Sequence, residues 1–219
     1  ELNNQSFIDK GAIPKFVGEL NYPIYHLDFE TFTSAVPVFD GSRPYQRLVF
    51  QYSLHIEHKN GKIDHREYLA EVNGEDPRIK FIEQLISDCG DSGDVLVYNI
   101  GFERGKLFDL VEFSPKHKVP ILKIIDRLKD LMIPFRDRMY YTPSMQGSYS
   151  IKKVLPALVP ELSYKDLNIQ EGGTASNTFS QMVQGNFQGD VVQTRKDLLA
   201  YCELDTLAMV RILDVLRNT

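Results

Sequence analysis

The sequence predicts an α/β fold in which a mixed β-sheet, with three antiparallel strands followed by parallel strands, is flanked by helices. Three observations lead to this prediction. The Asn60-Gly61 dipeptide separates two runs rich in β-forming residues, a pattern typical of a hairpin. Further on, short apolar runs alternate with segments that have helix start and stop signals. The chain closes with a long segment whose apolar residues recur at helical spacing.

The first half of the chain supplies the antiparallel strands. The apolar run at residues 24–30, which follows a proline, predicts a buried strand. Residues 47–58 and 62–70 predict the two arms of the hairpin. Three antiparallel strands result.

Helices and a parallel strand are expected next. Asp76 as N-cap, Pro77 at the first helical position and Gly90 just past the end delimit one helix. Residues 94–98 predict a short strand, and residues 101–113 predict the helix that it leads into. This order favours helices packed on both faces of the sheet.

The second half is less regular. Residues 121–125 fit either a strand or the start of a helix. Ser150 can cap a helix that Pro156 would stop or kink. The Gly-, Ser- and Asn-rich stretch at residues 170–189 predicts a long surface connection, and residues 190–216 predict the terminal helix.

The length of 219 residues fits a single domain. Residues 1–22 have no sustained period and contain Gly and Pro breakers, so we expect an N-terminal arm there and one domain over residues 23–219. The chain begins with Glu rather than Met. We therefore expect it to be part of a longer protein.

Composition excludes several classes of protein. The hydrophobic share of 42% and the charged share of 25% disfavour disordered, collagenous and coiled-coil chains. Two cysteines, Cys89 and Cys202, are too few for a disulfide framework or a zinc-ligand set, which favours a reducing compartment. The sequence also lacks a membrane-spanning apolar run and a signal peptide. We therefore expect a cytoplasmic protein without a membrane partner.

The charge is distributed unevenly. The net charge of −5 argues against nucleic-acid binding. Residues 115–165, however, contain ten Lys and Arg against four acids, interleaved with Phe135, Tyr140, Tyr141 and Tyr149. Such a mixture is typical of channels that bind single-stranded nucleic acid. The alternative is a solvated basic surface with its aromatic residues in the core.

Carboxylates fall at three informative places. Asp28 and Glu30 are two apart near the end of a predicted strand, so they share one face of the sheet. Glu103 lies in the first turn of the helix after residues 94–98. Tyr201 and Asp205 are four apart on the terminal helix, on one side of it. Each place alone also has an ordinary structural interpretation. The two strand acids could be solvated or paired with Lys or Arg, and Glu103 could simply interact with the helix dipole. The tyrosine on the terminal helix could pack beside a solvated aspartate.

Together, these three places resemble in order and context the motifs of the DEDD 3′→5′ exonucleases, which have a ribonuclease H-like fold. Tyr201, four residues before the last acid, resembles the tyrosine subgroup of that superfamily. Residues 147–155 are similar to the Ser-Leu-Lys helix start often found between the second and third motifs. The resemblance spans nearly the whole chain.

A more specific resemblance is to an uncharacterised bacterial family of unknown function within that superfamily. It rests on Asp-Phe-Glu-Thr-Phe at 28–32, Arg-Pro-Tyr-Gln at 43–46, Tyr-Asn-x-x-Phe-Glu at 98–103 and Tyr-Cys-x-x-Asp-Thr-x-Ala-Met at 201–209. In such proteins this domain often follows a nuclease domain of another type. The resemblance therefore implies a second nuclease domain in the full-length chain.

The resemblance implies a catalytic site with two Mg²⁺ or Mn²⁺ ions, consistent with the preference of these ions for oxygen ligands. Asp28 would bridge both ions, Glu30 and Asp205 would complete the first, and Glu103 would hold the second. Tyr201 would orient the attacking water. The substrate would be the 3′ end of single-stranded DNA or RNA, and the products nucleoside 5′-monophosphates. The residues expected to bind it are Thr31, Phe32, Asn99, Phe102, Ser150, Lys152 and Lys153.

The chain departs from the DEDD pattern at two places. Glu103 stands where Asp is usual, and Phe32-Thr33 stand where Thr-Gly often follow the first Glu-Thr. Two alternatives therefore stay open beside the exonuclease. One is a catalytically weak nucleic-acid-binding module of a larger nuclease, and the other is a phosphoesterase that acts on nucleotides or very short oligonucleotides.

Overall fold

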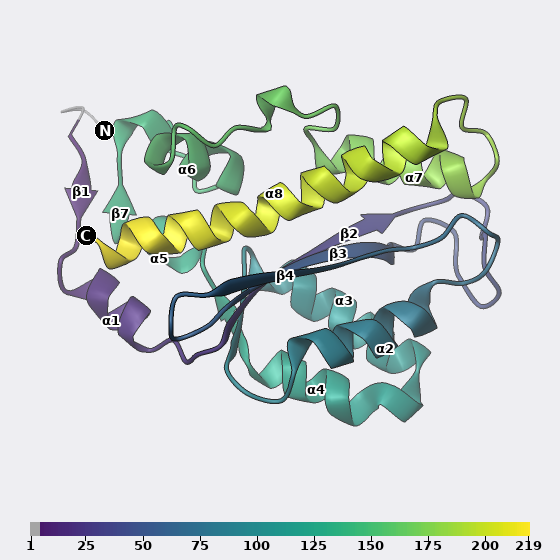
Figure 1. The fold of residues 1–219 in the computed structure, drawn as a ribbon, viewed down its shortest axis with the longest axis horizontal. Coiled ribbons are helices and arrows are strands. Elements are labelled where there is room, and N and C mark those ends of the chain that lie inside the picture. The colour runs from purple at the N-terminus through teal and green to yellow at the C-terminus, as the bar shows by residue number, and fades with distance from the viewer. Residues whose placement is uncertain (1–4) are drawn as a thin grey trace.

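A five-stranded mixed sheet lies at the centre of the structure, a computed structural model that describes residues 5–219 (Figure 1). The strand order is β4-β3-β2-β5-β6; the first three strands pair antiparallel, and β5 and β6 continue the sheet in parallel. The predicted mixed sheet is therefore confirmed. Its strands are β2 (Ile24–Phe32), β3 (Leu48–Glu57), β4 (Ile63–Leu69), β5 (Asp94–Val97) and β6 (Leu128–Asp130).

The hairpin between β3 and β4 has the register that its turn sequence predicts. Glu57 pairs with Ile63, and His55 pairs with His65, so the pairing is centred on Asn60. Gly61 has a φ of 82°, which a glycine adopts without strain. The predicted hairpin is confirmed.

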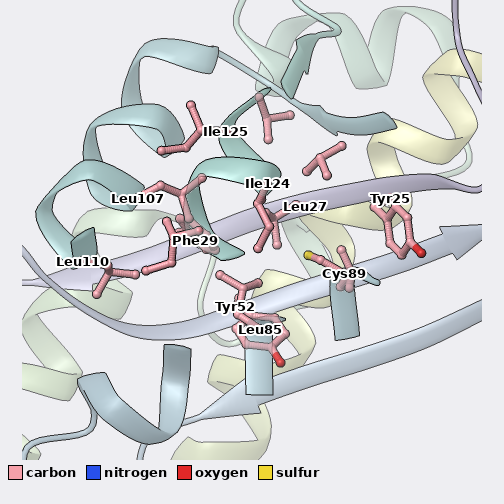
Figure 2. Close-up of a cluster of buried hydrophobic side chains, with 14 of the residues drawn as sticks. Tyr25, Leu27, Phe29, Tyr52, Leu85, Cys89, Leu107, Leu110, Ile124 and Ile125 are labelled. Atoms are coloured by element: carbon pink, nitrogen blue, oxygen red, sulfur yellow. The ribbon is translucent and has the colours of Figure 1, made fainter. Parts of the chain in front are cut away.

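Three helices cover one face of the sheet, α2 (Arg78–Cys89), α3 (Ile100–Phe113) and α4 (Lys118–Asp126) (Figure 1). The apolar core between them and the sheet includes alternate residues of β2, among them Leu27 and Phe29 (Figure 2). Period-two alternation places these side chains on the same face, away from the residues between them.

The long helix α8 (Val191–Arg217) crosses the opposite face of the sheet (Figure 1). A second apolar cluster joins it to α1 (Ala12–Gly18) and α6 (Ile151–Leu158). A third cluster joins the ends of β2 and β3 to α7 (Gly172–Val183) and α8, and in it Phe50 and Phe179 stack at 4.0 Å.

The remaining elements are short. Among residues 5–219, no helix combines the length and the apolar character that a membrane span requires. A small second sheet pairs β1 with β7. These elements are β1 (Phe7–Ile8), η1 (Pro115–His117), α5 (Ile133–Arg136), β7 (Tyr140–Tyr141), η2 (Pro143–Met145) and η3 (Tyr164–Asp166).

Two segments differ from the sequence prediction in the second half. Of the two alternatives for residues 121–125, the helix is right, because Ile121, Ile124 and Ile125 form one buried helical face of α4. The expected connection at residues 170–189 is wrong, because it contains the twelve-residue helix α7. Burial of Ala175, Phe179 and Met182 stabilises this helix despite its poor helix formers.

Smaller differences occur at helix ends and in the expected arm. Helix α6 begins after Ser150 as predicted but continues two residues beyond Pro156. Helix α2 begins at Arg78, one residue later than predicted. Within the expected arm, residues 1–4 lie outside the described part of the chain, and residues 12–18 form α1, whose Ile13 is fully buried in the second cluster.

Candidate metal centre

Strand β2 presents two carboxylates to the face of the sheet that α8 crosses. Asp28 and Glu30 alternate with Leu27 and Phe29, which face the first core. Glu30 is 8% exposed, and Asp28 is partly exposed. A register shift against β3 follows between Glu30 and Thr31, and the extra residue is Phe50 on β3.

Helix α8 brings Asp205 to the same place. Ligand oxygens of Asp28, Glu30 and Asp205 all lie within 4.8 Å of one another. Asp205 is 7% exposed, and the hydroxyl of Tyr164 donates a 2.6 Å hydrogen bond to its Oδ1. Sequence reasoning missed Tyr164, which lies in the short η3 helix and carries no motif.

Glu103 lies near this group but does not belong to it. It follows Asn99, whose left-handed backbone (φ 80°) begins α3, and it is 2% exposed. Within the described chain its Oε2 has no hydrogen-bond partner. The expected set of four ligands is therefore three gathered carboxylates and, beside them, the buried Glu103 carboxylate with one unpartnered oxygen among the described residues.

The four carboxylates have pKa values above the ordinary range for carboxyl groups. Burial is the main cause, and it raises the pKa of Glu30 and Glu103 to about 8 and that of Asp205 to about 6. Burial, and then repulsion from Asp205 and Glu30, raises the pKa of Asp28 well above its ordinary value. Desolvated like charges of this kind need a cation to stay ionised together.

The donor set fits a hard divalent cation. All donors are carboxylate oxygens, which Mg²⁺ and Mn²⁺ prefer, and no imidazole or thiolate belongs to the set. The orphaned oxygen of Glu103 is a further donor next to the gathered three. Asp28, Glu30 and Asp205 could hold one ion, and Glu103 could serve a second.

A groove of about 470 Å³ opens over the carboxylates. Seven of its lining residues were not predicted, and three of them, Gly172, Gly173 and Ser176, belong to α7, the helix that the sequence did not predict. A side chain at Gly172 would lie 3.7 Å from the Glu30 carboxylate and the Tyr201 hydroxyl. The predicted site residues that line the groove are Asp28, Glu30, Thr31, Phe102, Lys152, Tyr201 and Asp205; the others are Phe29, Thr33, Arg47, Ile151, Gly172, Gly173 and Ser176.

Four residues predicted to bind substrate do not line the groove. Phe32 is 1% exposed and packs edge-on against Phe179 in the third cluster. Phe32 lies on the same side of β2 as Asp28 and Glu30, but helix α7 covers it there, whereas Thr31 lines the groove. The other three are exposed at helix starts: Asn99 before α3, Ser150 before α6 and Lys153, whose Nζ donates to Gln146.

The basic segment at residues 115–165 is dispersed. Of its ten cations, Lys152 lines the groove. Arg127 instead donates to the backbone carbonyls that follow α2, and Lys123 and Lys116 lie near acids on that side of the molecule. Phe135 is buried in the second cluster. The structure therefore places one positive charge of this segment at the carboxylates rather than a continuous channel.

Tyr201 lines the groove one helical turn before Asp205. Burial, and then the nearby carboxylates, raises the pKa of its hydroxyl, so the hydroxyl stays protonated at neutral pH. The Nζ of Lys152 lies 5.5 Å from the ring centroids of both Tyr201 and Tyr164, and it donates to the carbonyl of Gln170. One end of the groove thus combines a neutral hydroxyl donor with one cation.

Comparison with known proteins assigns the chain to a family. Residues 25–150, more than half of the chain, match the family described as domain of unknown function (DUF2779). The chain belongs to this family. The match includes Asp28, Glu30 and Glu103 and ends before α8.

Curated relatives of the chain are uncharacterised. The chain is similar to uncharacterized protein UU173 of Ureaplasma parvum serovar 3, with 28% identity over 96% of this chain and 33% of the relative. It is also similar to the uncharacterized MG366 homolog of Mycoplasma pneumoniae, with 30% identity over 85% of this chain and 31% of the relative. The chain thus spans about a third of the length of these relatives. No solved structure matches it.

Proposed function

We propose that this chain is a metal-dependent 3′→5′ exonuclease that hydrolyses single-stranded DNA or RNA to nucleoside 5′-monophosphates, with Mg²⁺ or Mn²⁺ as its cofactor. The observation that carries the proposal is the convergence of Asp28, Glu30 and Asp205, from β2 and α8, at the floor of one groove. The resemblance of these motifs to the DEDD exonucleases and the mixed sheet beneath them support it further.

The carboxylates would hold the cofactor. Asp28, Glu30 and Asp205 would bind one cation, and Glu103 would bind a second together with Asp28. When bound, divalent cations supply Lewis-acid stabilisation of the charge that develops on a phosphodiester during hydrolysis. Tyr164 fixes the orientation of the Asp205 carboxylate through its hydrogen bond to Oδ1.

Other groove residues would bind and orient the substrate. The protonated hydroxyl of Tyr201 would hydrogen-bond the attacking water, because its raised pKa makes it unsuitable as a base. Lys152 and the free N–H groups at the start of α7 would bind the phosphate. Thr31 and Phe102 would contact the terminal nucleotide.

The test is degradation of 5′-labelled DNA and RNA single strands in the presence of Mg²⁺ or Mn²⁺. We expect a ladder that shortens from the 3′ end and is lost in Asp28→Asn and Asp205→Asn. Asp197→Asn makes the same chemical change elsewhere on α8, where Asp197 accepts bonds from Gln193 and Asn168, and should keep the activity. Equal residual activity in wild type and both site variants would indicate a contaminant and reject the proposal.

A second candidate is a phosphoesterase that acts on nucleotides or very short oligonucleotides. Two cations, Arg47 and Lys152, line the groove, which favours this reading because a long strand needs several phosphate contacts. Binding of long strands should then depend weakly on salt. A steep salt dependence, together with faster cleavage of long strands, would favour the exonuclease.

We also propose that this domain is one part of a longer nuclease. The relatives are about three times as long as the matched region, which leaves room for another nuclease domain in the full-length chain. If Glu103 cannot complete the site, the domain would act as a weakly catalytic nucleic-acid-binding module of that larger nuclease. The two buried free cysteines agree with a cytoplasmic location.

A further inference from the structure

A second group of metal-ligating side chains lies at the other side of α8, over β3 and β4. His55 and His65 are direct cross-strand partners, and Glu203 faces them from the helix. One nitrogen of each histidine and one carboxylate oxygen lie within 4.8 Å of one another. His55 is buried, whereas the side chain of Glu203 is 48% exposed, so an ion could enter from solvent.

A chain of hydrogen bonds determines which histidine nitrogens are free. The Thr206 hydroxyl donates to the backbone carbonyl of Glu203, which can only accept. Its oxygen must therefore accept from His55 Nδ1 at 2.8 Å and from the Ser53 hydroxyl at 2.7 Å. Because the Ser53 proton is used in this way, Ser53 must accept from His65 Nε2 at 2.9 Å.

This network protonates one nitrogen on each ring and leaves a lone pair on the other. His55 Nε2 and His65 Nδ1 are thus free to bind a cation, and His65 Nδ1 lies 4.0 Å from Glu203 Oε1. Ligating histidines in metalloproteins are held in the same manner, with the second nitrogen donating to a fixed acceptor. The network therefore leaves one unprotonated nitrogen on each ring, while the ring centroids lie 4.5 Å apart at an interplanar angle of 31°, so a shared ion requires the partly exposed His65 ring to turn.

We propose that His55, His65 and Glu203 form a second cation site that binds a borderline transition ion such as Zn²⁺. Two imidazoles and one carboxylate suit zinc, whereas the all-oxygen set at Asp28 suits Mg²⁺ or Mn²⁺. Ligands at a tetrahedral zinc lie about 3.4 Å apart, so the exposed Glu203 side chain, 4.0 Å from His65 Nδ1, and the His65 ring would move closer when an ion binds.

An ion at this site would tie the β3–β4 hairpin to α8. It would also brace the carboxylate centre, since Ser53 pairs with Asp28 across the sheet and Thr206 directly follows Asp205. The second site does not depend on the proposed nuclease activity, because its ligands are separate from the carboxylate centre.

The test is titration of the metal-free chain with Zn²⁺, and with Co²⁺ as a spectroscopic probe, in millimolar Mg²⁺. We expect one Zn²⁺ per chain and a visible Co²⁺ absorption band typical of mixed nitrogen and oxygen ligands. His65→Gln and Glu203→Gln should each lower the affinity at least about tenfold. His58→Gln is the matched control on the same hairpin, where His58 contacts Asp64, and should bind as wild type does.

Three results would overturn the site. They are a wild-type chain that binds no Zn²⁺ at micromolar concentration, equal affinity in wild type and His65→Gln, and binding lost in Asp28→Asn but kept in both site variants. Thermal unfolding of the metal-free variants checks their folding, and Glu203→Gln, on the surface, keeps the test valid if His65→Gln does not fold. A nuclease assay without activity would leave this result unaffected.

Discussion

The two faces of the central sheet are built from alternate residues of the same strands, and they differ sharply in character. Toward α2, α3 and α4, β2 presents Leu27 and Phe29 to an apolar core. Toward α8, it presents Asp28 and Glu30, whose pKa values burial raises. The apolar face gains free energy from burial, whereas the polar face costs free energy until a cation binds. The face toward α2, α3 and α4 therefore only stabilises the fold, whereas the face toward α8 combines the buried carboxylates with the second and third apolar clusters.

The largest effect should come from breaking the apolar face. Phe29→Ala removes a buried ring that packs 5.5 Å from Phe81, so we expect a loss of about 3–5 kcal/mol in the free energy of unfolding. Urea denaturation measures it. Val36→Ala, at a 72% exposed position, should change the stability little. A loss below about 1 kcal/mol for Phe29→Ala would show that this face is not the stabilising one.

The next largest effect is the pH dependence of stability that the buried carboxylates cause in the metal-free chain. Because the folded-state pKa values of Glu30 and Glu103 are raised to about 8, the folded chain binds more protons than the unfolded chain above about pH 4.5. The free energy of unfolding of the metal-free chain should therefore fall as the pH rises from about 5 to about 8. Mg²⁺ at about 100 times its Kd should restore about 2.7 kcal/mol at the higher pH.

Urea denaturation at both pH values, with and without Mg²⁺, measures this coupling. Asp28→Asn is the control, since it should lose most of the Mg²⁺ response. Stability that rises with pH in the absence of metal would contradict the prediction, because it would require lowered pKa values at the site.

A smaller effect is expected from the residue that positions Asp205. Tyr164→Phe removes the hydroxyl that donates to Asp205 Oδ1, and we expect Mn²⁺ affinity to fall about tenfold, or roughly 1.4 kcal/mol. Calorimetric titration measures it. Tyr149→Phe makes the same change at a 47% exposed tyrosine and should leave the affinity unchanged. Equal affinities in both variants would remove Tyr164 from the site.

The smallest expected effect is an increase in the free energy of unfolding rather than a loss. Asp28→Asn replaces a buried carboxyl group, whose ionised form is disfavoured by burial and by Asp205 and Glu30, with a neutral amide, so the metal-free variant should be more stable than wild type at a pH where the carboxylates ionise. Thermal and urea unfolding in a chelator measure it. A less stable variant would contradict this prediction, because it would mean that the Asp28 carboxylate makes contacts that stabilise the fold without metal.

The parts of the site that follow from local periodicity could be predicted from the sequence. Alternation along β2 places Asp28 and Glu30 together, and helical spacing places Tyr201 and Asp205 together. The order of the elements also predicts the mixed sheet, because a hairpin and a later strand–helix pair leave few arrangements.

The rest depends on contacts between distant segments. Phe32 is buried because the unpredicted helix α7 covers it, and Tyr164 meets Asp205 only through the tertiary fold. The cross-strand pair of His55 and His65 follows from a hairpin centred on Asn60, yet the role of Glu203 requires the placement of α8. Helix α7 was missed because its stability comes from burial rather than from helix-forming residues.

The aromatic stack beneath α7 has a consequence for the kinetics of binding. Phe50 and Phe179 stack at 4.0 Å, and Phe32 packs edge-on against both, so the wall of the groove that carries Gly172 is fixed to the ends of β2 and β3. A displacement of α7 away from the sheet would separate the buried rings of Phe32, Phe50 and Phe179. A ligand therefore meets a preformed groove, and its association rate is set by encounter and orientation rather than by a slow opening of the protein.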